Sequence, residues 1–170
     1  GGGGSGGGGG SDRSYKPGPF CRTVVEGQTL STLCPVVDDL LDGGLAPVEF
    51  FEVFGQSASG KTQLIQQLAT SALLSDPLAR VIFVDTYNTF RPTRVLEIAR
   101  GVGGHVVENE MQRAALLDRI SVGRPKTQGQ QLAMLRSLSF NPPKSLAMVC
   151  VDSVISLYRS ASSRKLPETD

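Results

Sequence analysis

The sequence contains a single histidine, His105, and this scarcity excludes a histidine-rich metal centre. One histidine also leaves little from which to build a histidine-based catalytic triad. Glycines stand directly before His105 and valines directly after it. That setting predicts a residue in a loop or at the edge of a strand.

Cysteine is scarce too, because Cys21, Cys34 and Cys150 lie far apart and form no C-x-x-C pair. The odd number of cysteines and the lack of a signal-peptide pattern favour a reducing, intracellular setting. Cys150 lies in an apolar run and is predicted to be a small buried hydrophobic residue. No apolar run approaches the ~18 residues that a membrane-spanning helix needs, so we expect no membrane partner.

The sequence also lacks an excess of charge of either sign. The net charge of +1 gives no basic signal for nucleic acid over the whole chain, so any DNA-binding surface must be local. Residues 1–11 contain only Gly and Ser and are predicted to be a flexible linker. Residues 12–28, with Lys16-Pro17-Gly18-Pro19, are predicted to be an extended arm, which could dock on a neighbour or do nothing. We expect residues 29–170 to form the one folded domain.

One stretch matches the phosphate-binding pattern G-x-x-x-x-G-K-[ST] in full: Gly55-Gln56-Ser57-Ala58-Ser59-Gly60-Lys61-Thr62. Residues 48–54 before it are apolar and β-prone, which predicts a strand. The residues after it predict a helix, because they place apolar side chains at intervals of three and four: Leu64, Ile65, Leu68, Ala69, Ala72 and Leu73. Strand, loop and helix in this order are the context that such a loop requires.

Each part of this loop has a chemical task. Gly55 and Gly60 allow a positive φ and a close approach of the backbone to an anion. Successive N–H groups and the positive end of the following helix can cradle phosphates. Lys61 places a charge at the β- and γ-phosphate oxygens, and the Thr62 hydroxyl can ligate Mg²⁺. We therefore predict a nucleotide site.

The rest of the chain alternates between strands and helices. Strands are predicted over 80–85, 120–122 and 146–151, and helices over 92–101 and 127–138, with a helix or turn over 111–117. A short helix before the loop is predicted to be capped by Ser31 or Thr32 and to end at Gly43-Gly44. This order predicts an α/β fold with a parallel sheet and helices on both faces. The apolar run 146–151 is typical of a parallel strand buried on both faces.

Asp152 directly follows that last strand. Open α/β sheets bind ligands at the carboxyl ends of their strands, so this carboxylate is placed to hold Mg²⁺ directly or through water, as in a Walker B segment. The alternative is that Asp152 only caps the helix that follows.

Four segments, in the right order and at similar spacing, resemble the RadA-type recombinases of the archaeal and eukaryotic branch of the RecA/RadA superfamily. Residues 54–64 resemble the family's phosphate loop, including Thr62-Gln63-Leu64 after the lysine. The run Asp85-Thr86-Tyr87-Asn88-Thr89-Phe90-Arg91-Pro92-Thr93-Arg94 resembles the family's Asp-Thr-Glu-Gly-Thr-Phe-Arg-Pro-Glu-Arg. Residues 151–159 resemble the Walker B strand and the start of the first DNA-binding loop, and residues 30–45 resemble the segment that leads into the core.

The resemblance implies a RecA-like P-loop ATPase core that binds ATP and Mg²⁺, with the metal at Thr62 and Asp152. It implies head-to-tail assembly with other recombinase subunits on single- or double-stranded DNA, for strand exchange and repair. Arg94 would pack on the adenine, and Arg159, Arg164 and Lys165 would begin the first DNA-contact loop. Taken as residues alone, those three cations form only a basic surface loop. The implied location is the nucleus in a eukaryote or the cytoplasm in an archaeon.

Three departures from the family pattern bear on function. Tyr87 stands where the family has its catalytic glutamate, and Thr32-Leu33 stands where it usually has Thr-Gly. The sequence also stops at Asp170, inside the first DNA loop, so we expect a C-terminally incomplete core.

Two functions remain open within this family. One is a DNA-dependent ATPase that forms filaments, and the other is a binding module that holds ATP at a subunit interface with little hydrolysis. A phenol is a poor general base at neutral pH, so Tyr87 favours the second unless another residue, such as Glu52, supplies the base. A third alternative, an unrelated P-loop kinase, would need acid and arginine pairs in a lid, which the sequence does not offer.

Overall fold

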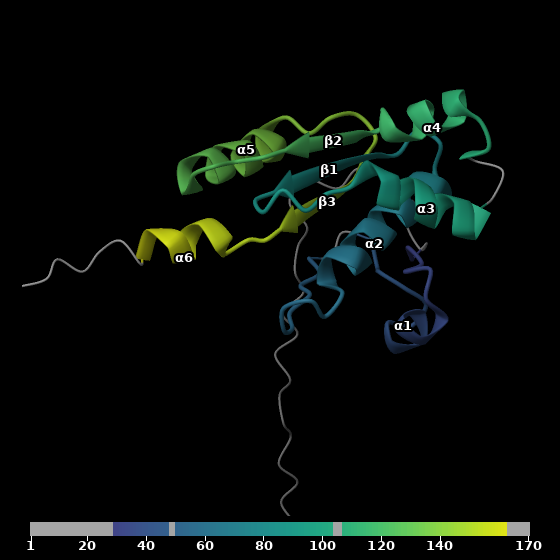
Figure 1. Ribbon diagram of the computed structural model, residues 1–170, viewed down its shortest axis with the longest axis horizontal. Helices are drawn as coiled ribbons and strands as arrows, with labels where there is room; N and C mark the ends of the chain where they lie inside the picture. The colour runs from purple at the N-terminus through teal and green to yellow at the C-terminus, as the bar shows by residue number, and fades with distance from the viewer. Residues whose placement is uncertain (1–28, 48–49, 104–106, 163–170) are drawn as a thin grey trace, which may run out of the picture.

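The computed structural model describes residues 29–47, 50–103 and 107–162, apart from the side chains of 160–162. The linker, the arm, Cys21, His105, Arg164 and Lys165 lie outside the described residues, so the expectations for them remain predictions. The helices are α1 (Pro35–Leu40), α2 (Lys61–Ser75), α3 (Pro92–Gly103), α4 (Glu110–Leu117), α5 (Gln128–Phe140) and α6 (Ser156–Ser162). Figure 1 shows their arrangement around one sheet.

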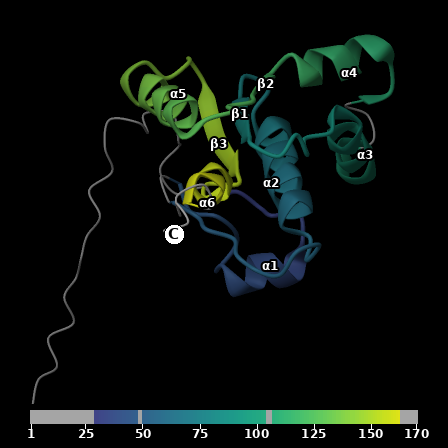
Figure 2. The ribbon, with the colours of Figure 1, turned by 60° about the vertical axis from the view of Figure 1, so that its left-hand side comes forward.

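The described sheet has three parallel strands in the order β2-β1-β3. These are β1 (Arg80–Asp85), β2 (Ile120–Gly123) and β3 (Leu146–Asp152). Helix α5 lies on one face of the sheet, and α2 and α3 lie on the other (Figures 1 and 2). The predicted parallel α/β sheet with helices on both faces is therefore confirmed.

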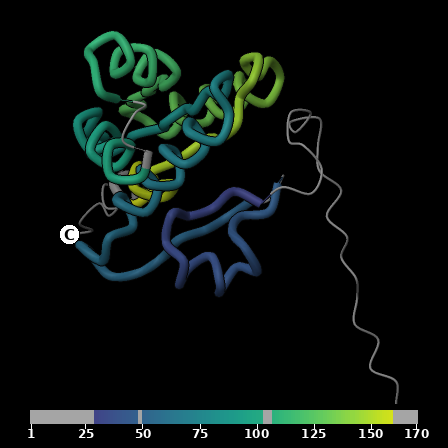
Figure 3. Tube along the Cα trace, turned by 90° about the vertical axis from the view of Figure 1, so that its right-hand side faces the viewer, coloured from purple at the N-terminus to yellow at the C-terminus, as the bar shows by residue number. Residues whose placement is uncertain are grey.

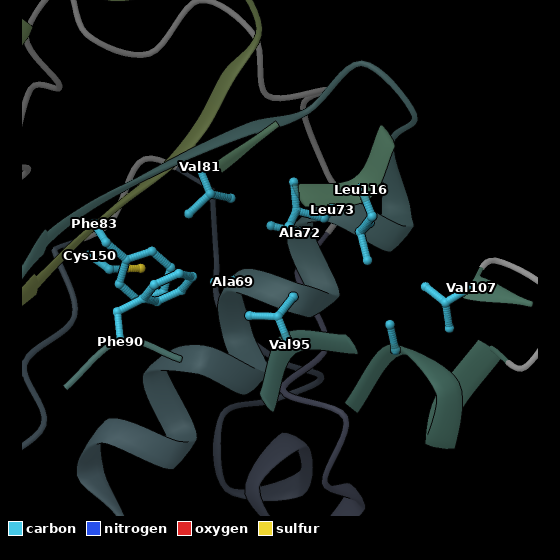
Figure 4. Close-up of a cluster of buried hydrophobic side chains, with 11 residues drawn as sticks. Ala69, Ala72, Leu73, Val81, Phe83, Phe90, Val95, Val107, Leu116 and Cys150 are labelled. Atoms are coloured by element: carbon cyan, nitrogen blue, oxygen red, sulfur yellow. The ribbon is translucent and has the colours of Figure 1, made fainter. Parts of the chain in front are cut away.

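The core lies between the sheet and the helices α2 and α3 that cover one of its faces (Figure 4). In α2, four residues of the predicted apolar stripe are buried, Leu68, Ala69, Ala72 and Leu73, and the other two, Leu64 and Ile65, are half-buried. Two of these are alanines, which let the helix approach β1 closely. The Phe83 and Phe90 rings pack with their centroids 4.5 Å apart, and fully burying one such side chain contributes about 1.5–3 kcal/mol.

From α3 to α5, the helix boundaries follow the sequence signals closely, with one exception. Helix α3 begins at Pro92, and α5 has Thr127 as its N-cap, whose hydroxyl accepts from the Gln130 N–H. Helix α4 is preceded by a capping box between Asn109 and Gln112. The exception is Gly101, where we expected α3 to stop, because the helix continues to Gly103. A glycine inside a helix costs about 1 kcal/mol relative to alanine, which is not enough to end it.

The N-terminal segment is held by a carboxylate rather than by a hydroxyl cap. The N-cap of α1 is Cys34, which makes no side-chain cap bond, so the cap predicted at Ser31 or Thr32 is wrong. Instead, the Ser31 hydroxyl donates to Asp38 Oδ2 (2.7 Å) and the Thr32 N–H donates to Asp38 Oδ1 (2.6 Å). Helix α1 ends at Leu40, earlier than the predicted end at Gly43-Gly44, although the chain does turn at these two glycines, which have positive φ.

Two side chains of α2 fasten this segment to the core. Ser71 Oγ donates to the Ser31 carbonyl and Gln67 Nε2 donates to the Thr32 carbonyl, both at 2.6 Å. Figure 3 shows the segment, in purple and blue, along one side of the molecule. These two hydrogen bonds add to apolar packing of the same segment, since Leu30 packs against the core and Leu45 is buried.

The prediction of a strand before the phosphate loop is wrong for residues 50–54, the part of that run that the structure describes. Residues 50–54 form no strand, and Phe50 and Phe54 are 83% and 88% exposed. A strand needs a hydrogen-bonded neighbour, and in the described part of the chain none pairs with this run. Strand propensity alone was therefore a misleading signal here.

Strand β3 is also less buried than its sequence predicted. It is parallel to β1 as expected, but of its seven residues Cys150 alone is buried, while Ala147 is exposed. Within the described residues β3 pairs with β1 alone, so it is an edge strand, and only one of its two edges is hydrogen-bonded to a neighbouring strand. Burial raises the pKa of the Cys150 thiol to about 12, helped by the nearby Asp152 charge.

Candidate functional site

The candidate phosphate loop opens helix α2 and is exposed from Gly55 to Gly60. Gly60, the N-cap, has φ +91°, and a Cβ there would meet nothing within 4 Å, so the backbone angle is what requires glycine. The other positive φ in the loop belongs to Ala58 (+60°), not to Gly55 as predicted. At Gly55 a Cβ would lie 3.0 Å from Ser59 Oγ, a tight contact that the exposed Ser59 side chain could relieve by a small shift.

Lys61 lies over its own loop. Its Nζ donates to the carbonyls of Gly55 (3.0 Å) and Gln56 (2.5 Å), and it lies 3.4 Å from Ser59 Oγ. The bonds to the carbonyls are exposed ones that water can replace at little cost. The ammonium group is therefore available to an anion at the loop, next to the N-terminus of α2.

Thr62 and Asp152 are brought together from opposite ends of the sequence. The Thr62 hydroxyl donates to Asp152 Oδ2 at 2.6 Å, although the two residues are 90 positions apart. Thr62 lies in the first turn of α2, and Asp152 is the last residue of β3. The two predicted metal ligands therefore meet at the carboxyl edge of the sheet.

A second carboxylate, Asp85, lies at the end of the neighbouring strand, paired in register with Asp152. Asp85 is 2% exposed and accepts from the N–H groups of Thr89 (2.9 Å) and Phe90 (3.1 Å). Arg124 Nε lies 3.7 Å from its Oδ2. Burial by itself raises the pKa of Asp85, but these hydrogen bonds, the Thr89 hydroxyl and the Arg124 charge together lower it.

Sequence reasoning missed Asp85, Thr89 and Arg124. The signal that found Asp152 also applies to Asp85, because each is an acid at the carboxyl end of an apolar parallel strand. Arg124 directly follows β2, at the same edge of the sheet. No local pattern predicts that Thr89 comes between the two acids.

A small cavity of about 10 Å³ lies at this edge, and its lining includes Thr62, Gln66, Asp85, Thr89 and Asp152. Gln66 is 1% exposed, and its buried Oε1 has no partner within the described part of the chain. The hydroxyl, carboxylate and amide oxygens here are ligands that suit Mg²⁺, which keeps several of its waters. The oxygen donors thus suit magnesium at Thr62 and Asp152, and the cavity itself has room for about one water, for which Gln66 Oε1 would be an acceptor.

The described residues contain no cluster of three or more His, Cys, Asp or Glu side chains suited to a metal ion. Thr62 and Asp152 alone would therefore need phosphate oxygens and water to complete an octahedral shell. This requirement matches a metal ion that arrives with a nucleotide rather than one bound by the protein alone.

Arg94 reaches from α3 to the start of α2. Its Nε donates to Gln63 Oε1 (2.7 Å), and its Nη1 forms an ion pair with Glu97 (2.9 Å). The Arg94 side chain is 45% exposed. The structure thus brings together two predicted nucleotide-contact residues, Gln63 and Arg94, while packing of Arg94 on an adenine remains a prediction.

Tyr87 lies in the turn that follows β1 and is 62% exposed. Two residues on, Thr89 N–H is bonded to Asp85, and Phe90 turns inward against Phe83. The phenol therefore projects outward from a turn whose other end is fixed in the site. Glu52, the alternative base, is exposed in the segment before the loop.

Arg159 lies on α6 and is exposed. The start of this helix is tied to the end of β1, because Ser156 Oγ donates to Thr86 Oγ1 (2.6 Å) and the Ser153 N–H donates to the same oxygen (2.8 Å). Of the three predicted DNA-contact residues, the described part of the chain contains Arg159 only. None of the described helices is both long and apolar enough to cross a membrane.

Comparison with known proteins adds independent information. A family model described as Rad51 matches residues 23–165. The chain is 36% identical over 141 residues to the DNA repair and recombination protein RadA of Methanoculleus marisnigri, covering 77% of this chain and 43% of that protein. It is 34% identical over 135 residues to the meiotic recombination protein DMC1 homolog of Arabidopsis thaliana, covering 76% and 37%. The chain therefore spans less than half the length of these relatives.

Proposed function

The chain belongs to the Rad51 family, and on that premise we propose that it is the ATP- and Mg²⁺-binding part of a RadA-type recombinase acting in homologous recombination and DNA repair. The observation that supports this most is the hydrogen bond from Thr62 to Asp152, which joins the phosphate loop to the carboxyl end of β3. Membership of this family also removes the unrelated P-loop kinase as an alternative.

In this proposal each residue has a definite part. Lys61 exchanges its bonds to the loop carbonyls for bonds to phosphate oxygens. The first N–H groups of α2 face the phosphates, and Thr62 and Asp152 hold the magnesium ion. That ion neutralises part of the triphosphate charge. Arg94, positioned by Gln63 and Glu97, offers a flat guanidinium to the adenine.

We further propose that the chain holds ATP at a subunit interface and hydrolyses it slowly or not at all. The support is Tyr87, which occupies the position of the family's catalytic glutamate and has no carboxylate to orient or deprotonate the attacking water. A phenol can donate a hydrogen bond to a phosphate oxygen, which favours holding ATP over cleaving it. The competing hypothesis is an active DNA-dependent ATPase that forms filaments.

The proposed partners are DNA, reached through Arg159 and the Arg164-Lys165 segment, and other recombinase subunits packed against the nucleotide. The proposed location is inside the cell, in the nucleus of a eukaryote or the cytoplasm of an archaeon. The low net charge of the chain makes DNA contact local, so few phosphates are neutralised and binding should weaken only moderately with added salt.

The nucleotide site is tested by calorimetric titration with ATP and Mg²⁺. Lys61→Ala removes the loop's cation and should weaken binding by about 2 kcal/mol or more, which is roughly 30-fold in affinity. Lys144→Ala is the matched control, because Lys144 is exposed at the opposite end of the sheet, just before β3. Equal affinities for wild type and Lys61→Ala would refute the site.

A further inference from the structure

Thr89 lies between the two carboxylates that end β1 and β3. Its Oγ1 is 3.3 Å from Asp85 Oδ1 and 3.3 Å from Asp152 Oδ2. Its own N–H donates to Asp85 Oδ1 at 2.9 Å, so the residue is fixed to β1 through its backbone. One hydroxyl therefore connects the acid of β1 to the acid of β3.

The hydroxyl has only one proton for these two acceptors. Asp152 Oδ2 already accepts from Thr62 at 2.6 Å, so Thr89 is its second donor. Two donors from different elements, α2 and the turn after β1, restrict the rotation of the Asp152 carboxylate. Among the described residues, removing Thr89 would leave Thr62 as the one hydrogen-bond donor to that oxygen, and Thr62 is itself a predicted metal ligand.

Asp85 and Arg124 hold Thr89 in place. The buried Asp85 carboxylate accepts from the N–H groups of Thr89 and Phe90, which fixes the turn that begins at Thr86. Arg124 Nε, 3.7 Å from Asp85 Oδ2, supplies a half-exposed positive charge from the end of β2. The carboxyl end of each strand of the described sheet thus carries one of these residues: Asp85 ends β1, Asp152 ends β3 and Arg124 follows β2.

We propose that Thr89, held by Asp85 and through it by Arg124, is a positioning residue that orients Asp152 for the magnesium ion of a bound nucleotide. This inference rests on the proposed function. It assigns Asp85 to support Thr89 rather than to bind the metal, since both of its oxygens already accept from backbone N–H groups. Outer-shell partners of this kind typically contribute 10- to 100-fold to metal affinity.

The test measures the Mg²⁺ requirement for nucleotide binding, using a fluorescent N-methylanthraniloyl derivative of ATP. Wild type, Thr89→Val and Thr89→Ser are each titrated with Mg²⁺, and binding in EDTA is measured in parallel. Thr89→Val keeps the shape but loses the hydroxyl, so it should need about 10-fold more Mg²⁺ for half-maximal binding. Thr89→Ser restores the hydroxyl and should behave as wild type, and binding in EDTA should not change in either variant.

A double-mutant cycle tests the part assigned to Arg124. Arg124→Gln alters a half-exposed side chain, so it should fold even if Thr89→Val does not. It should raise the Mg²⁺ requirement in the wild-type background and have little further effect in Thr89→Val. A full additional effect there would show that Arg124 does not act through Thr89.

The possible outcomes distinguish a failure of this inference from a failure of the proposed nucleotide-binding function. If wild type binds the nucleotide, Lys61→Ala does not, and Thr89→Val has an unchanged Mg²⁺ requirement, the positioning role is wrong and the nucleotide site stands. Equal effects of Thr89→Val and Thr89→Ser, or an equal loss of binding in EDTA, would also overturn it. If Lys61→Ala binds as well as wild type, the proposed function fails and the inference fails with it.

Discussion

Backbone strain in this chain falls on a few residues that carry side chains. Leu33 in the N-terminal segment and Ala58 in the phosphate loop both have φ +60°, in the left-handed region. That conformation costs a residue other than glycine about 1–2 kcal/mol. Leu33 stands where the RadA-type pattern usually has glycine, so this departure has replaced an unstrained residue with a strained one.

Two substitutions at Leu33 isolate this strain, because both remove the side chain beyond Cβ and they differ only in the Cβ methyl group, which opposes a positive φ. At an ordinary position glycine is less stable than alanine by about 0.5–1 kcal/mol. At φ +60° the order should reverse, so Leu33→Gly should exceed Leu33→Ala by about 1 kcal/mol in free energy of unfolding. Urea titration measures both, and a more stable alanine variant would contradict the left-handed conformation.

Tyr87 decides between the two hypotheses about turnover. Losing a general base typically costs about 10²–10⁴-fold in rate, so we expect near-background phosphate release from the wild type. Tyr87→Glu should raise the rate by about 10²-fold or more, because the side chain is exposed and a carboxylate fits there without repacking. The measurement is steady-state phosphate release with single-stranded DNA and a hydrolysis-deficient RadA-type recombinase as the neighbouring subunit.

Tyr87→Gln is the matched control, since glutamine has the shape of glutamate but cannot act as a base. It should stay at the wild-type rate and bind ATP with the same affinity. Brisk turnover by the wild type would instead favour the filament-forming ATPase and would direct the search for a base to Glu52.

At the scale of elements, the ends of the strands hold more of the chemistry than the strands themselves. Asp85 ends β1 and organises the following turn through two backbone N–H groups. Asp152 ends β3 and accepts from Thr62 and Thr89. Because parallel strands bring their carboxyl ends to one edge, two acids 67 positions apart in sequence become neighbours.

Asp85 should make the stability of the fold sensitive to acid. Its pKa in the folded chain is lowered from the ordinary value of 3.8, so its contribution is complete above that value and is lost as the pH falls through the folded pKa. Asp85→Asn should reduce stability by about 2 kcal/mol near pH 7, since hydrogen bonds to a charged group are lost. The gap between wild type and variant should narrow below about pH 4.

Urea unfolding of both proteins from pH 7 to pH 2.5 checks this expectation. Lys144→Ala serves as a control, because that side chain is exposed at the far end of the sheet. A gap between wild type and Asp85→Asn that stays constant over the whole range would mean that the carboxylate charge contributes nothing to stability.

The sequence predicted most elements correctly because local signals were strong where they formed. Helix α3 begins at Pro92 and α5 follows Thr127, since proline and a hydroxyl cap act within one turn. The candidate phosphate loop and Asp152 were predicted from pattern and position, and the structure brings Thr62 and Asp152 together. What local signals could not give was pairing and three-dimensional proximity: the isolated run 50–54, the half-covered β3, and Thr89 between two acids.

For the molecule as a whole, the sheet and its surroundings leave apolar surface uncovered in the described part of the chain. Strand β3 is an edge strand there, and the residues just beyond it, Val154 and Ile155, are about half exposed. Phe50 and Phe54 are more than four-fifths exposed. Unpaired strand edges and exposed apolar side chains promote association between copies of a chain.

We therefore expect the isolated chain to self-associate, with β3 contributing to the contact. Ala147→Lys places a charge on an exposed position of that strand and should raise the monomer fraction, because charged side chains oppose edge-to-edge pairing. Ala114→Lys makes the same change on the exposed face of α4 and should have no such effect. Sedimentation velocity at several concentrations distinguishes the three proteins. A wild-type chain that stays a monodisperse monomer and melts cooperatively in the usual range of about 45–65 °C would show that this surface is stable in water without a partner.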